Sequence, residues 1–488
     1  YLKQLSLFFI LLTFCGCQPM EDKENLAYPS SHPGRQNLLD ETDPTELIVK
    51  GNIPTWLQGT LLRVGPSWFG NNPSQASLHW FDGLSMLHAF ELKDNNIVYY
   101  NKFLRSEPFL RAKKTDVFAF QGFAANPYDN VLQNMFFMLF GGDETTNSNV
   151  NIYKVAGKYL ALTELPPPLE FDRETLNTIG GFPYADSLPK SNVFESAHPQ
   201  YDIDQKCYYN YIVTFIPTSS YLIYKIPEHS SKRTLLTEIP VKNPSYMHSF
   251  SITKNYIIFT EYPFKLADNL LLSGKPFIKN YAWDKNAKTK VTIINKNYPW
   301  DVKTYCTEPF FSFHHINAYE VDNNIVLNAM GYKDSDIVER VGFFPKYLDP
   351  SYLVTINIDL TNNKVSMDRA TVGTVDLPRI NSAYNGRAYR YFYAVHFKTQ
   401  HHNLIKWDRE KNSILSWSEE ECFAGEPIFI QNPSGSGQED DGVILSLVLD
   451  VNKKVSFLLV LDAKNLKELA RAYLPHSVPF GLHGQFYN

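Results

Sequence analysis

The strongest constraint on the fold of this chain is a recurring pattern of short apolar runs between residues 48 and 486. The runs are rich in β-branched and aromatic residues, and Asn, Asp, Gly, Pro and Lys separate them. Runs of this kind are typical of β-strands. Clear examples are residues 96–100, 208–215, 256–260, 324–329 and 455–461. The sequence therefore predicts an all-β protein.

These strands are predicted to form one large domain, residues 44–488. The chain has 488 residues, of which 44% are hydrophobic, so it can bury a sizeable core. No linker rich in Pro, Gly or Ser divides it. A β-propeller is the natural way to arrange so many short strands without long exposed edges. No sequence repeat typical of propellers is visible, so the pattern does not give the number of blades.

Four histidines far apart in the sequence lie in unusual contexts. They are His198 in Phe-Glu-Ser-Ala-His-Pro, His248 in Tyr-Met-His-Ser-Phe, His314 in Phe-His-His-Ile-Asn-Ala-Tyr-Glu and His483 in Phe-Gly-Leu-His-Gly. Neutral imidazole is a good ligand for ferrous iron, and four such ligands leave two positions open on a six-coordinate metal. A single histidine in an apolar strand is more often a hydrogen-bonded core residue, so the contexts decide the interpretation.

All four contexts, in this order, resemble the iron-ligand segments of the carotenoid cleavage oxygenases. That family includes carotenoid dioxygenases, stilbene-cleaving dioxygenases and the retinoid isomerohydrolase of the vertebrate retinal pigment epithelium. Residues 59–66 and 79–83 resemble its N-terminal signatures, and the resemblance runs from about Pro44 to the C-terminus. It implies a seven-bladed β-propeller, with a few helices and loops forming a cap over the iron-bearing face. The histidines would then lie on different blades and point at a common axis.

The resemblance also implies the metal and its surroundings. One Fe(2+) per subunit, with O2 as co-substrate and no organic cofactor, is expected at His198, His248, His314 and His483. In the family, glutamates orient three of the four ligands through the second ring nitrogen. Glu164 and Glu426 match two of these positions, and the third falls at Asp376. Aspartate is one methylene shorter, so either a backbone shift or a bridging water is expected there.

The remaining histidines are expected to be structural. His315 follows a ligand directly, and neighbours on a strand point to opposite faces, so it should make a hydrogen bond elsewhere. His79 begins the second signature segment, and His88 follows it. His401 and His402 lie in a polar stretch, which favours a surface loop.

The substrate is expected to be an apolar polyene, because aromatic residues such as Phe310, Phe311 and Phe313 precede His314 and could line a tunnel. A separate apolar segment resembles the part of the family fold that dips into a membrane at the tunnel mouth. This segment consists of Met135, Phe136, Phe137, Met138, Leu139 and Phe140. It predicts a peripheral membrane contact.

The N-terminus has the layout of a secretory signal. Lys3 precedes an apolar run at residues 5–12, and Gly16-Cys17 resembles the lipobox of bacterial lipoproteins. Residues 1–17 are therefore interpreted as a lipoprotein-type signal with Cys17 as the lipidated residue, and residues 18–43 as a flexible polar tether. This predicts an exported, membrane-anchored protein. A cytoplasmic protein with peripheral membrane contact is the alternative, because the chain begins at Tyr1.

Several function classes receive no support from the sequence. The formal net charge is −5 without a long basic block, which argues against nucleic-acid binding. Cys207, Cys306 and Cys422 are odd in number and lack CxxC spacing, so neither zinc nor a disulfide framework is indicated. Motifs of metalloproteases, serine hydrolases and P-loop proteins are missing. Protein partners are not indicated.

The sequence thus predicts an Fe(II)-dependent dioxygenase that cleaves a conjugated C=C bond of a carotenoid or apocarotenoid into two carbonyl products. A stilbene-cleaving dioxygenase and a retinyl ester isomerohydrolase are the alternatives, because the same four histidines serve both reactions in the family. A propeller that only binds a lipid or a partner is the non-enzymatic alternative.

Overall fold

The computed structural model describes residues 28–29, 31–70, 79–115, 118, 120, 122–125, 147–267, 275–342 and 348–488. The signal expected at residues 1–17, the lipidated Cys17 and the apolar segment 135–140 all lie outside these residues, so they stay predictions. In the part of the chain that is described, no helix is both long and apolar enough to cross a bilayer.

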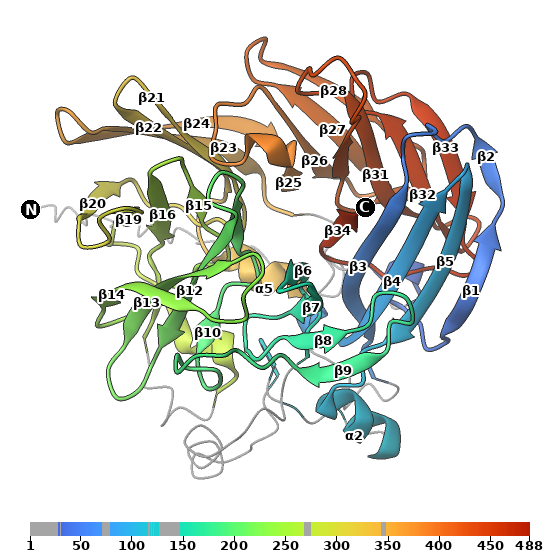
Figure 1. The fold of residues 1–488 in the computed structure, drawn as a ribbon, viewed down its shortest axis with the longest axis horizontal. Helices are drawn as coiled ribbons and strands as arrows, with labels where there is room; N and C mark the ends of the chain where they lie inside the picture. The colour runs from blue at the N-terminus through green and yellow to red at the C-terminus, as the bar shows by residue number, and fades with distance from the viewer. Residues whose placement is uncertain are drawn as a thin grey trace, which may run out of the picture.

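The described chain is built mainly of antiparallel sheets arranged around a common centre (Figure 1). Five sheets have four or five strands each. They are β1 (Thr42–Leu47), β5 (Asn96–Phe103), β4 (Leu84–Lys93), β3 (Gly59–Trp68) and β34 (Gly484–Tyr487); β6 (Asn151–Val155), β7 (Lys158–Leu162), β8 (Leu169–Phe171) and β9 (Thr178–Gly181); β10 (Phe194–Glu195), β11 (Gln200–Asp202), β12 (Cys207–Thr214), β13 (Ser220–Pro227) and β14 (Thr234–Pro240); β15 (Ser251–Ile252), β16 (Tyr256–Glu261), β19 (Thr289–Asn295) and β20 (Val302–Thr307); and β21 (His315–Val321), β22 (Asn324–Gly331), β23 (Ser351–Asp359) and β24 (Lys364–Gly373).

A ten-stranded sheet completes the ring. Its strands are β25 (Val375–Arg379), β26 (Tyr391–Phe397), β27 (His402–Asp408), β28 (Ser413–Trp417), β29 (Cys422–Ala424), β30 (Ile428–Gln431), β31 (Gly442–Asp450), β32 (Val455–Asp462), β33 (Glu468–Tyr473) and β2 (Val49–Gly51). Its two halves meet through β27 and β29, which share the parallel pair His402↔Phe423. The propeller is confirmed, and seven blades result if these halves are counted separately.

Few helices accompany the strands, as expected. Within the described residues the α-helices are α2 (Glu107–Thr115) and α5 (Asp336–Gly342), and short 3₁₀ helices span Pro33–Arg35, Trp80–Asp82, Phe277–Asn280 and Ser382–Tyr384. A further short ribbon pairs β17 (Phe264–Leu266) with β18 (Tyr281–Trp283). In Figure 1, α5 lies near the centre of the ring. It contacts the 3₁₀ helix Trp80–Asp82.

Strands such as β31 and β32 are buried on both faces, which explains why their sequences are continuous apolar runs. On β31 and β32, Ile444 and Leu459 pack in one core cluster, whereas Leu445 and Leu458 pack in another. Successive side chains on a strand point to opposite faces, so each face meets a different neighbouring sheet. Burial of both faces removes the apolar–polar alternation of a half-exposed strand.

The ring is closed by the two ends of the domain. The C-terminal strand β34 pairs with β3, with Thr60 opposite Tyr487 and Arg63 opposite Gly484. At the other end, β2 pairs with β33, with Val49 opposite Ala472. Each terminal strand therefore completes a sheet formed mainly by the other end of the chain. This pairing anchors the C-terminal residues, which would otherwise fray.

The N-terminal segment differs from the tether that the sequence predicts. Tyr28 and Leu38 are buried, and the backbone N–H of Leu38 donates to the carbonyl of Ser67 over 2.9 Å. The strand β1 already begins at Thr42. The packed chain thus starts before residue 44, because aromatic and leucine side chains in an otherwise polar segment find apolar surface on the propeller.

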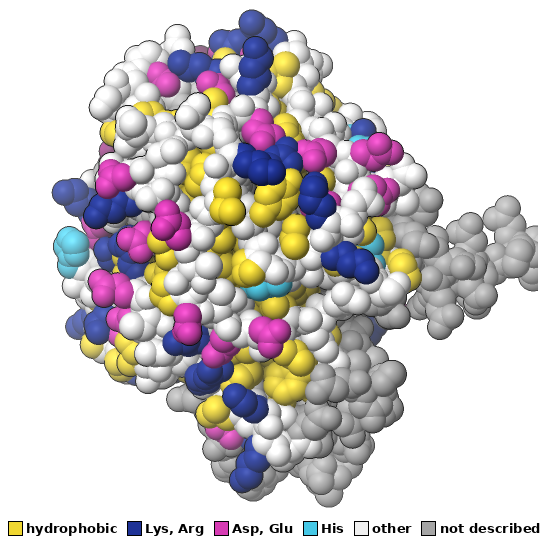
Figure 2. All heavy atoms as spheres, turned by 90° about the vertical axis from the view of Figure 1, so that its right-hand side faces the viewer, with side chains coloured by type: hydrophobic (Ala, Val, Ile, Leu, Met, Phe, Trp, Pro, Cys, Tyr) yellow, Lys and Arg dark blue, Asp and Glu magenta, His cyan; other side chains and the backbone are white. Residues whose placement is uncertain are grey.

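Charged groups of both signs alternate with apolar side chains on the face shown in Figure 2. Lys, Arg, Asp and Glu side chains are interspersed there rather than gathered into one patch of either sign. Opposite charges spaced in this way partly cancel at a distance. This face therefore presents no extended field of one sign.

Buried neutral histidines are predicted to make the stability of the fold depend on pH. Burial lowers the pKa of His79 to about 4, although its contact with the carbonyl of Val338 opposes the shift. The unfolded chain binds a proton near pH 6.5, but the folded chain does so only near pH 4. The contribution of His79 to the free energy of unfolding therefore has its full value above pH 6.5, and it decreases as the pH drops towards 4.

The variant His79→Gln tests this dependence. Its free energy of unfolding should change less between pH 6.5 and 4 than that of the wild type, by about 3 kcal/mol for this one group. Urea unfolding followed by circular dichroism at several pH values measures the difference. His229→Gln, at an exposed position, is the control and should keep the wild-type slope. Equal slopes for all three proteins would contradict the prediction.

Candidate metal centre

The four histidines lie at the central edges of four different sheets. His198 lies between β10 and β11, His248 lies just before β15, and His314 and His483 directly precede β21 and β34. Each of these strands is an edge strand of its sheet. The expectation that the histidines lie on different blades and point at a common axis is confirmed.

Their ring nitrogens meet at one point. One nitrogen from each of the four side chains lies within 4.8 Å of the others. The Nε2 atoms of His198 and His248 are 2.9 Å apart, and those of His314 and His483 are 3.3 Å apart. His248 and His483 are buried, and the side chain of His314 is 12% exposed. Four imidazoles so close together are a cluster that can hold one metal ion.

Serine hydroxyls tie the histidine segments to one another. Ser196 donates to the carbonyl of His248 over 2.8 Å, and Ser249 donates to the carbonyl of Phe313 over 2.7 Å. The backbone N–H of His315 in turn donates to the hydroxyl of Ser249 over 2.8 Å. Each of these serines lies within two residues of a histidine of the cluster. The relative positions of three sheets are thereby fixed at the site itself.

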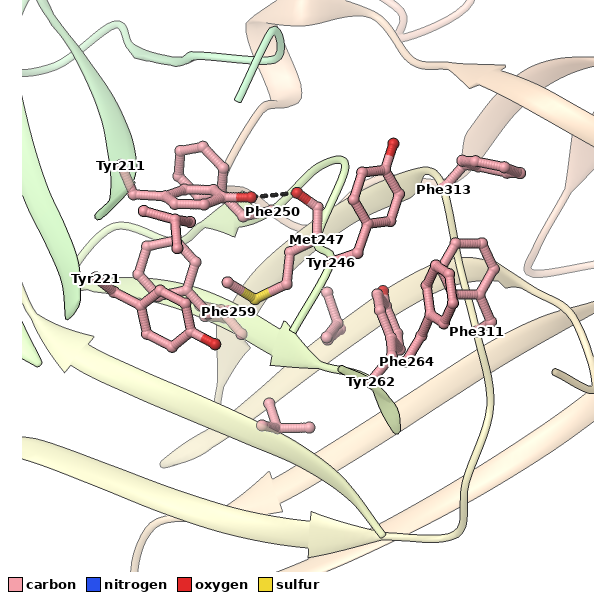
Figure 3. Close-up of a cluster of buried hydrophobic side chains, with 14 of the residues drawn as sticks. Tyr211, Tyr221, Tyr246, Met247, Phe250, Phe259, Tyr262, Phe264, Phe311 and Phe313 are labelled. Atoms are coloured by element: carbon pink, nitrogen blue, oxygen red, sulfur yellow. Dashed lines mark hydrogen bonds between the residues drawn. The ribbon is translucent and has the colours of Figure 1, made fainter. Parts of the chain in front are cut away.

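An aromatic core supports the loop that carries His248 (Figure 3). Tyr246 and Met247 precede it, and the hydroxyl of Tyr211 donates to the carbonyl of Met247. Phe311 and Phe313 pack edge to face with ring centroids 5.0 Å apart. Interlocked rings of this kind leave little freedom for the loop. The ligand loop is therefore held by packing as well as by hydrogen bonds.

Three carboxylates contact the outer ring nitrogens. Nδ1 of His248 lies 2.5 Å from Oε1 of Glu164, Nδ1 of His314 lies 2.7 Å from Oδ1 of Asp376, and Nδ1 of His483 lies 2.7 Å from Oε1 of Glu426. All three carboxylates are buried. The residues proposed from the sequence as orienting groups are thus brought to the histidines. Among the described residues, no carboxylate contacts the ring of His198.

These contacts determine which ring nitrogens are free to bind a cation. An ionised carboxylate only accepts hydrogen bonds, so the proton of each contacted imidazole lies on Nδ1. Burial lowers the pKa of His483 to about 4, although Glu426 opposes the shift, so this ring is neutral near pH 7. Its lone pair is then on Nε2. The Nε2 lone pairs of His314 and His483 would repel each other at 3.3 Å unless a cation lay between them.

Asp376 reaches its histidine directly. Its contact with His314 is 2.7 Å long, so no bridging water is needed. The register of β25 against β26 shifts between Asp376 and Arg379, and Leu377 has φ 54°, in the left-handed region. A non-glycine residue rarely adopts such a φ without support from its surroundings. Of the two expected solutions, the backbone irregularity is the one observed.

Further side chains that sequence reasoning missed hold the carboxylates. Tyr246 donates to Glu164 over 2.9 Å, and Tyr332 donates to Asp376 over 2.5 Å. Arg379 donates from Nε to Glu426 over 2.8 Å. Tyr246 lies two positions before His248, and Arg379 lies three positions after Asp376. This closeness in the sequence was the only signal that could have indicated their roles.

Burial and neighbouring charge act in opposite directions on two of these carboxylates. Burial favours the neutral acid of Glu426, but Arg379 and His483 outweigh it and hold its pKa well below the usual range. Burial likewise opposes ionisation of Asp376, but His314 and Tyr332 keep the pKa of this carboxyl below its usual value. Both groups are therefore ionised and act as acceptors for the imidazole N–H groups.

A largely apolar cavity opens beside the cluster. It encloses about 1010 Å³, including space open to solvent, and His248, His314 and His483 form part of its wall. The other lining residues are mostly aromatic and aliphatic, among them Trp80, Phe81, Phe123, Phe277, Phe313, Leu165, Leu348, Phe397 and Leu482. Apolar lining with a few polar groups at one end is typical of binding sites for apolar ligands. The aromatic residues expected to line a tunnel include Phe313, which does so, whereas Phe310 and Phe311 pack in the core.

The other histidines divide into two groups. His315 points away from the cluster, as expected, and contacts Ser251 and Tyr262 through its two ring nitrogens. His79 and His88 make buried contacts with the carbonyl of Val338 and with the hydroxyl of Tyr99. The prediction of a surface loop for His402 is wrong, because it begins β27 and is 8% exposed. The residues next to His402 in the sequence are polar, so the sequence gives no sign of the aromatic rings that pack against it in the fold.

Neighbouring histidines provide a matched test of the metal site. His314→Ala should reduce bound iron from about one ion per chain to near zero, because one of four ligands is removed. His315→Ala removes the same side chain one residue away and should retain the metal. Inductively coupled plasma mass spectrometry of both purified variants measures the content. Equal metal content in the two variants would contradict the assignment.

The orienting carboxylate gives a second test. Asp376→Asn keeps the shape of the side chain but removes the charge that fixes the Nδ1 proton of His314. Iron affinity should fall about 10- to 100-fold. Competition against a calibrated chelator measures the affinity, and Asp368→Asn, on the outer strand β24, is the control. An unchanged affinity in Asp376→Asn would show that the carboxylate does not support the ligand.

Comparison with known proteins gives a consistent result. Residues 35–488 match the family model described as Retinal pigment epithelial membrane protein. Mouse beta,beta-carotene 15,15'-dioxygenase is 31% identical over 520 residues, which cover 92% of this chain and 90% of the relative. The carotenoid isomerooxygenase of Galleria mellonella is 30% identical, with 94% of this chain and 97% of the relative covered.

A solved structure supports the same relationship. The cobalt-substituted Synechocystis ACO, an apocarotenoid oxygenase, superimposes with a TM-score of 0.82 and 26% identity, covering 93% of this chain and 98% of that chain. The match extends over the whole propeller rather than over one sheet. Together with the four-histidine cluster, these matches show that the chain belongs to the carotenoid cleavage oxygenase family.

Proposed function

We propose that this protein is an iron(II)-dependent dioxygenase that cleaves a conjugated C=C bond of a carotenoid or apocarotenoid into two carbonyl products. The observation that carries the proposal is the cluster of four imidazoles beside an apolar cavity. The relatives named carotenoid dioxygenases support the same reaction.

The donor set fits iron. It consists of imidazole nitrogens without thiolate, and three of the rings are oriented by carboxylates. We propose one Fe(II) per chain, held by His198, His248, His314 and His483. Bound iron would supply the redox chemistry that a reaction with O2 requires. No organic cofactor is part of the proposal.

The chain's own contribution is to position the substrate and to exclude water. Flat rings such as Trp80, Phe81 and Phe313 can contact both faces of a conjugated chain, and they leave few polar groups to hold water near it. Asp82 lies at the cavity wall and accepts hydrogen bonds from the backbone N–H groups of Phe123 and Ala124. Through these two hydrogen bonds Asp82 holds residues 122–125 in place beside the cavity.

The reaction balances without a further reductant or oxidant. The σ bond and the π bond of one C=C double bond break, and two C=O bonds form. The two oxygen atoms of one O2 end in the two products. A stilbene-cleaving enzyme would give the same balance on a shorter substrate. Isomerohydrolysis of a retinyl ester would leave O2 unused, which makes the origin of the product oxygen the decisive quantity.

Isotope labelling tests the proposal. Iron-loaded protein incubated under ¹⁸O2 with carotenoids, apocarotenoids, stilbenes and retinyl esters should give one labelled oxygen in each carbonyl product of a carotenoid or apocarotenoid. Because aldehydes exchange oxygen with water, the products should be reduced at once with borohydride and then weighed by mass spectrometry. His314→Ala protein should give no labelled product. Unlabelled retinol isomers would instead favour isomerohydrolysis, and labelled products from stilbenes alone would favour the stilbene-cleaving alternative.

A further inference from the structure

His198 differs from the other three histidines of the cluster in how its side chain is held. Carboxylates contact the outer ring nitrogens of His248, His314 and His483, whereas no carboxylate of the described chain contacts the ring of His198. A carboxylate partner fixes both the tautomer and the orientation of an imidazole. The position of the His198 ring therefore depends on the position of its own backbone.

Packing holds only part of the segment that carries His198. Ala197 is buried in a core cluster. Ser196 and Pro199, however, line a separate cavity, which encloses about 450 Å³, including space open to solvent. Atoms that face a cavity lack packing contacts on that side. The loop of His248, by contrast, lies among interlocked aromatic rings (Figure 3). The His198 segment thus depends more strongly on hydrogen bonds.

The segment also lies in a break of its sheet. The pairing of β10 with β12 ends at Glu195, and the pairing of β11 with β12 begins at Gln200. Residues 196–199 lie between these two strands and belong to neither. A sheet ladder therefore does not supply donors for their carbonyl groups. Buried carbonyl groups need donors, so other parts of the chain must provide them.

Two buried amides donate to the two carbonyl groups that precede His198. Nδ2 of Asn210, on β12, donates to the carbonyl of Ser196 over 2.8 Å. Nδ2 of Asn151, on β6, donates to the carbonyl of Ala197 over 3.1 Å. The two asparagines are 3% and 1% exposed, respectively. An ionised carboxylate has no donor, so it could not replace either amide in these contacts.

A third amide completes the set. Nε2 of Gln200 donates to the carbonyl of His198 itself over 3.3 Å. Three successive carbonyl groups of the segment thus each accept a side-chain N–H. Asn151 also accepts at Oδ1 from Nε2 of Gln485 over 3.3 Å, and Gln485 lies two residues after His483. The backbone that carries the first ligand is thereby linked to the strand that follows the last one.

We propose that Asn151, Asn210 and Gln200 position His198 for metal binding by holding its backbone, in place of the carboxylate that orients each of the other three rings. The inference rests on the proposed iron site and names the groups that hold its fourth ligand. The three amides contact carbonyl groups and no ring nitrogen of the cluster, so they are positioning residues rather than ligands. Their loss should displace His198 and leave the other three rings on their carboxylates.

Asn210→Leu is the sharpest variant for a test. Oδ1 of Asn210 has no hydrogen-bond partner in the described part of the chain. The substitution therefore removes the contact with Ser196 and no accepted hydrogen bond. Asn403, on β27, offers a matched control. It is 5% exposed, and its Oδ1 likewise has no partner among the residues that the structure describes. Asn403→Leu thus removes a comparable buried amide from another sheet.

Cobalt(II) is a suitable probe, because its visible absorption depends on the arrangement of its ligands and requires neither substrate nor O2. Asn210→Leu should bind cobalt(II) about tenfold more weakly than the wild type, as is typical when a group that orients a metal ligand is lost. Its absorption band at saturating cobalt(II) should also differ from that of the wild type. Asn403→Leu should match the wild type in both quantities. Competition against a calibrated chelator under nitrogen measures the affinity.

The absorption band separates a displaced ligand from a general loss of stability. A purely structural role would lower the melting temperature of Asn210→Leu and Asn403→Leu alike and leave the band of the folded, cobalt-loaded protein unchanged. If circular dichroism shows that Asn210→Leu does not fold, Gln200→Glu takes its place. It keeps the size of a half-buried side chain and removes the donor to the carbonyl of His198. The band should change in this variant too.

Each outcome separates this inference from the proposed function. A wild-type band and wild-type affinity in Asn210→Leu would overturn the inference, as would equal changes in Asn210→Leu and Asn403→Leu, or an unchanged band in Gln200→Glu. Failure of the wild-type protein to bind cobalt(II) or iron(II) would overturn the proposed metal site together with the inference. Labelled cleavage products combined with unchanged cobalt bands would leave the dioxygenase in place and remove only the role of the amides.

Discussion

The metal site depends on holding four imidazoles with their ring nitrogens facing one another at close range. Such an arrangement is unfavourable without a cation, so the surrounding chain must hold it in place. Buried carboxylates do so from outside by accepting the Nδ1 protons of His248, His314 and His483. The carboxylates are in turn held by Tyr246, Tyr332 and Arg379. Each layer of contacts fixes the one inside it, which is how a rigid metal site is built.

The propeller is well suited to this task because every part of the ring contributes one group. Four sheets provide the histidines, and the sheet of β6 to β9 leads into Glu164. Asp376 and Glu426 come from the two halves of the ten-stranded sheet. No two of these seven side chains are neighbours in the sequence. Their meeting therefore requires the closed ring, and the pairing of β34 with β3 places His483 within it.

The same ring leaves a cavity beside the histidine cluster that is largely apolar where a polyene would lie. The apolar wall is made of rings that also pack in the core, as Phe313 does beside Phe311. Arg63 is buried nearby, and Glu426, whose charge acts on it, already pairs with Arg379. Glu426 both supports His483 and shares its charge with Arg63 and Arg379.

Much of the candidate site could be predicted from the sequence, because its motifs are local. The contexts of His198, His248, His314 and His483 identified the ligands, and the acids at 164, 376 and 426 followed from the resemblance. Strand content was equally readable, since β-branched and aromatic runs prefer extended backbone. His315 was separated from His314 by strand geometry alone.

Tertiary structure alone decided the features that depend on contacts between distant residues. The direct contact of Asp376 with His314 needed the irregular backbone at Leu377, and the burial of His402 needed Phe480, far along the chain. The lack of a hydrogen-bond partner for Nη1 of Arg63 among the described residues is likewise invisible in a sequence, because it depends on all the groups that surround the atom. Local pattern fixes which residues are extended and which can bind a metal, whereas only packing fixes what each side chain meets.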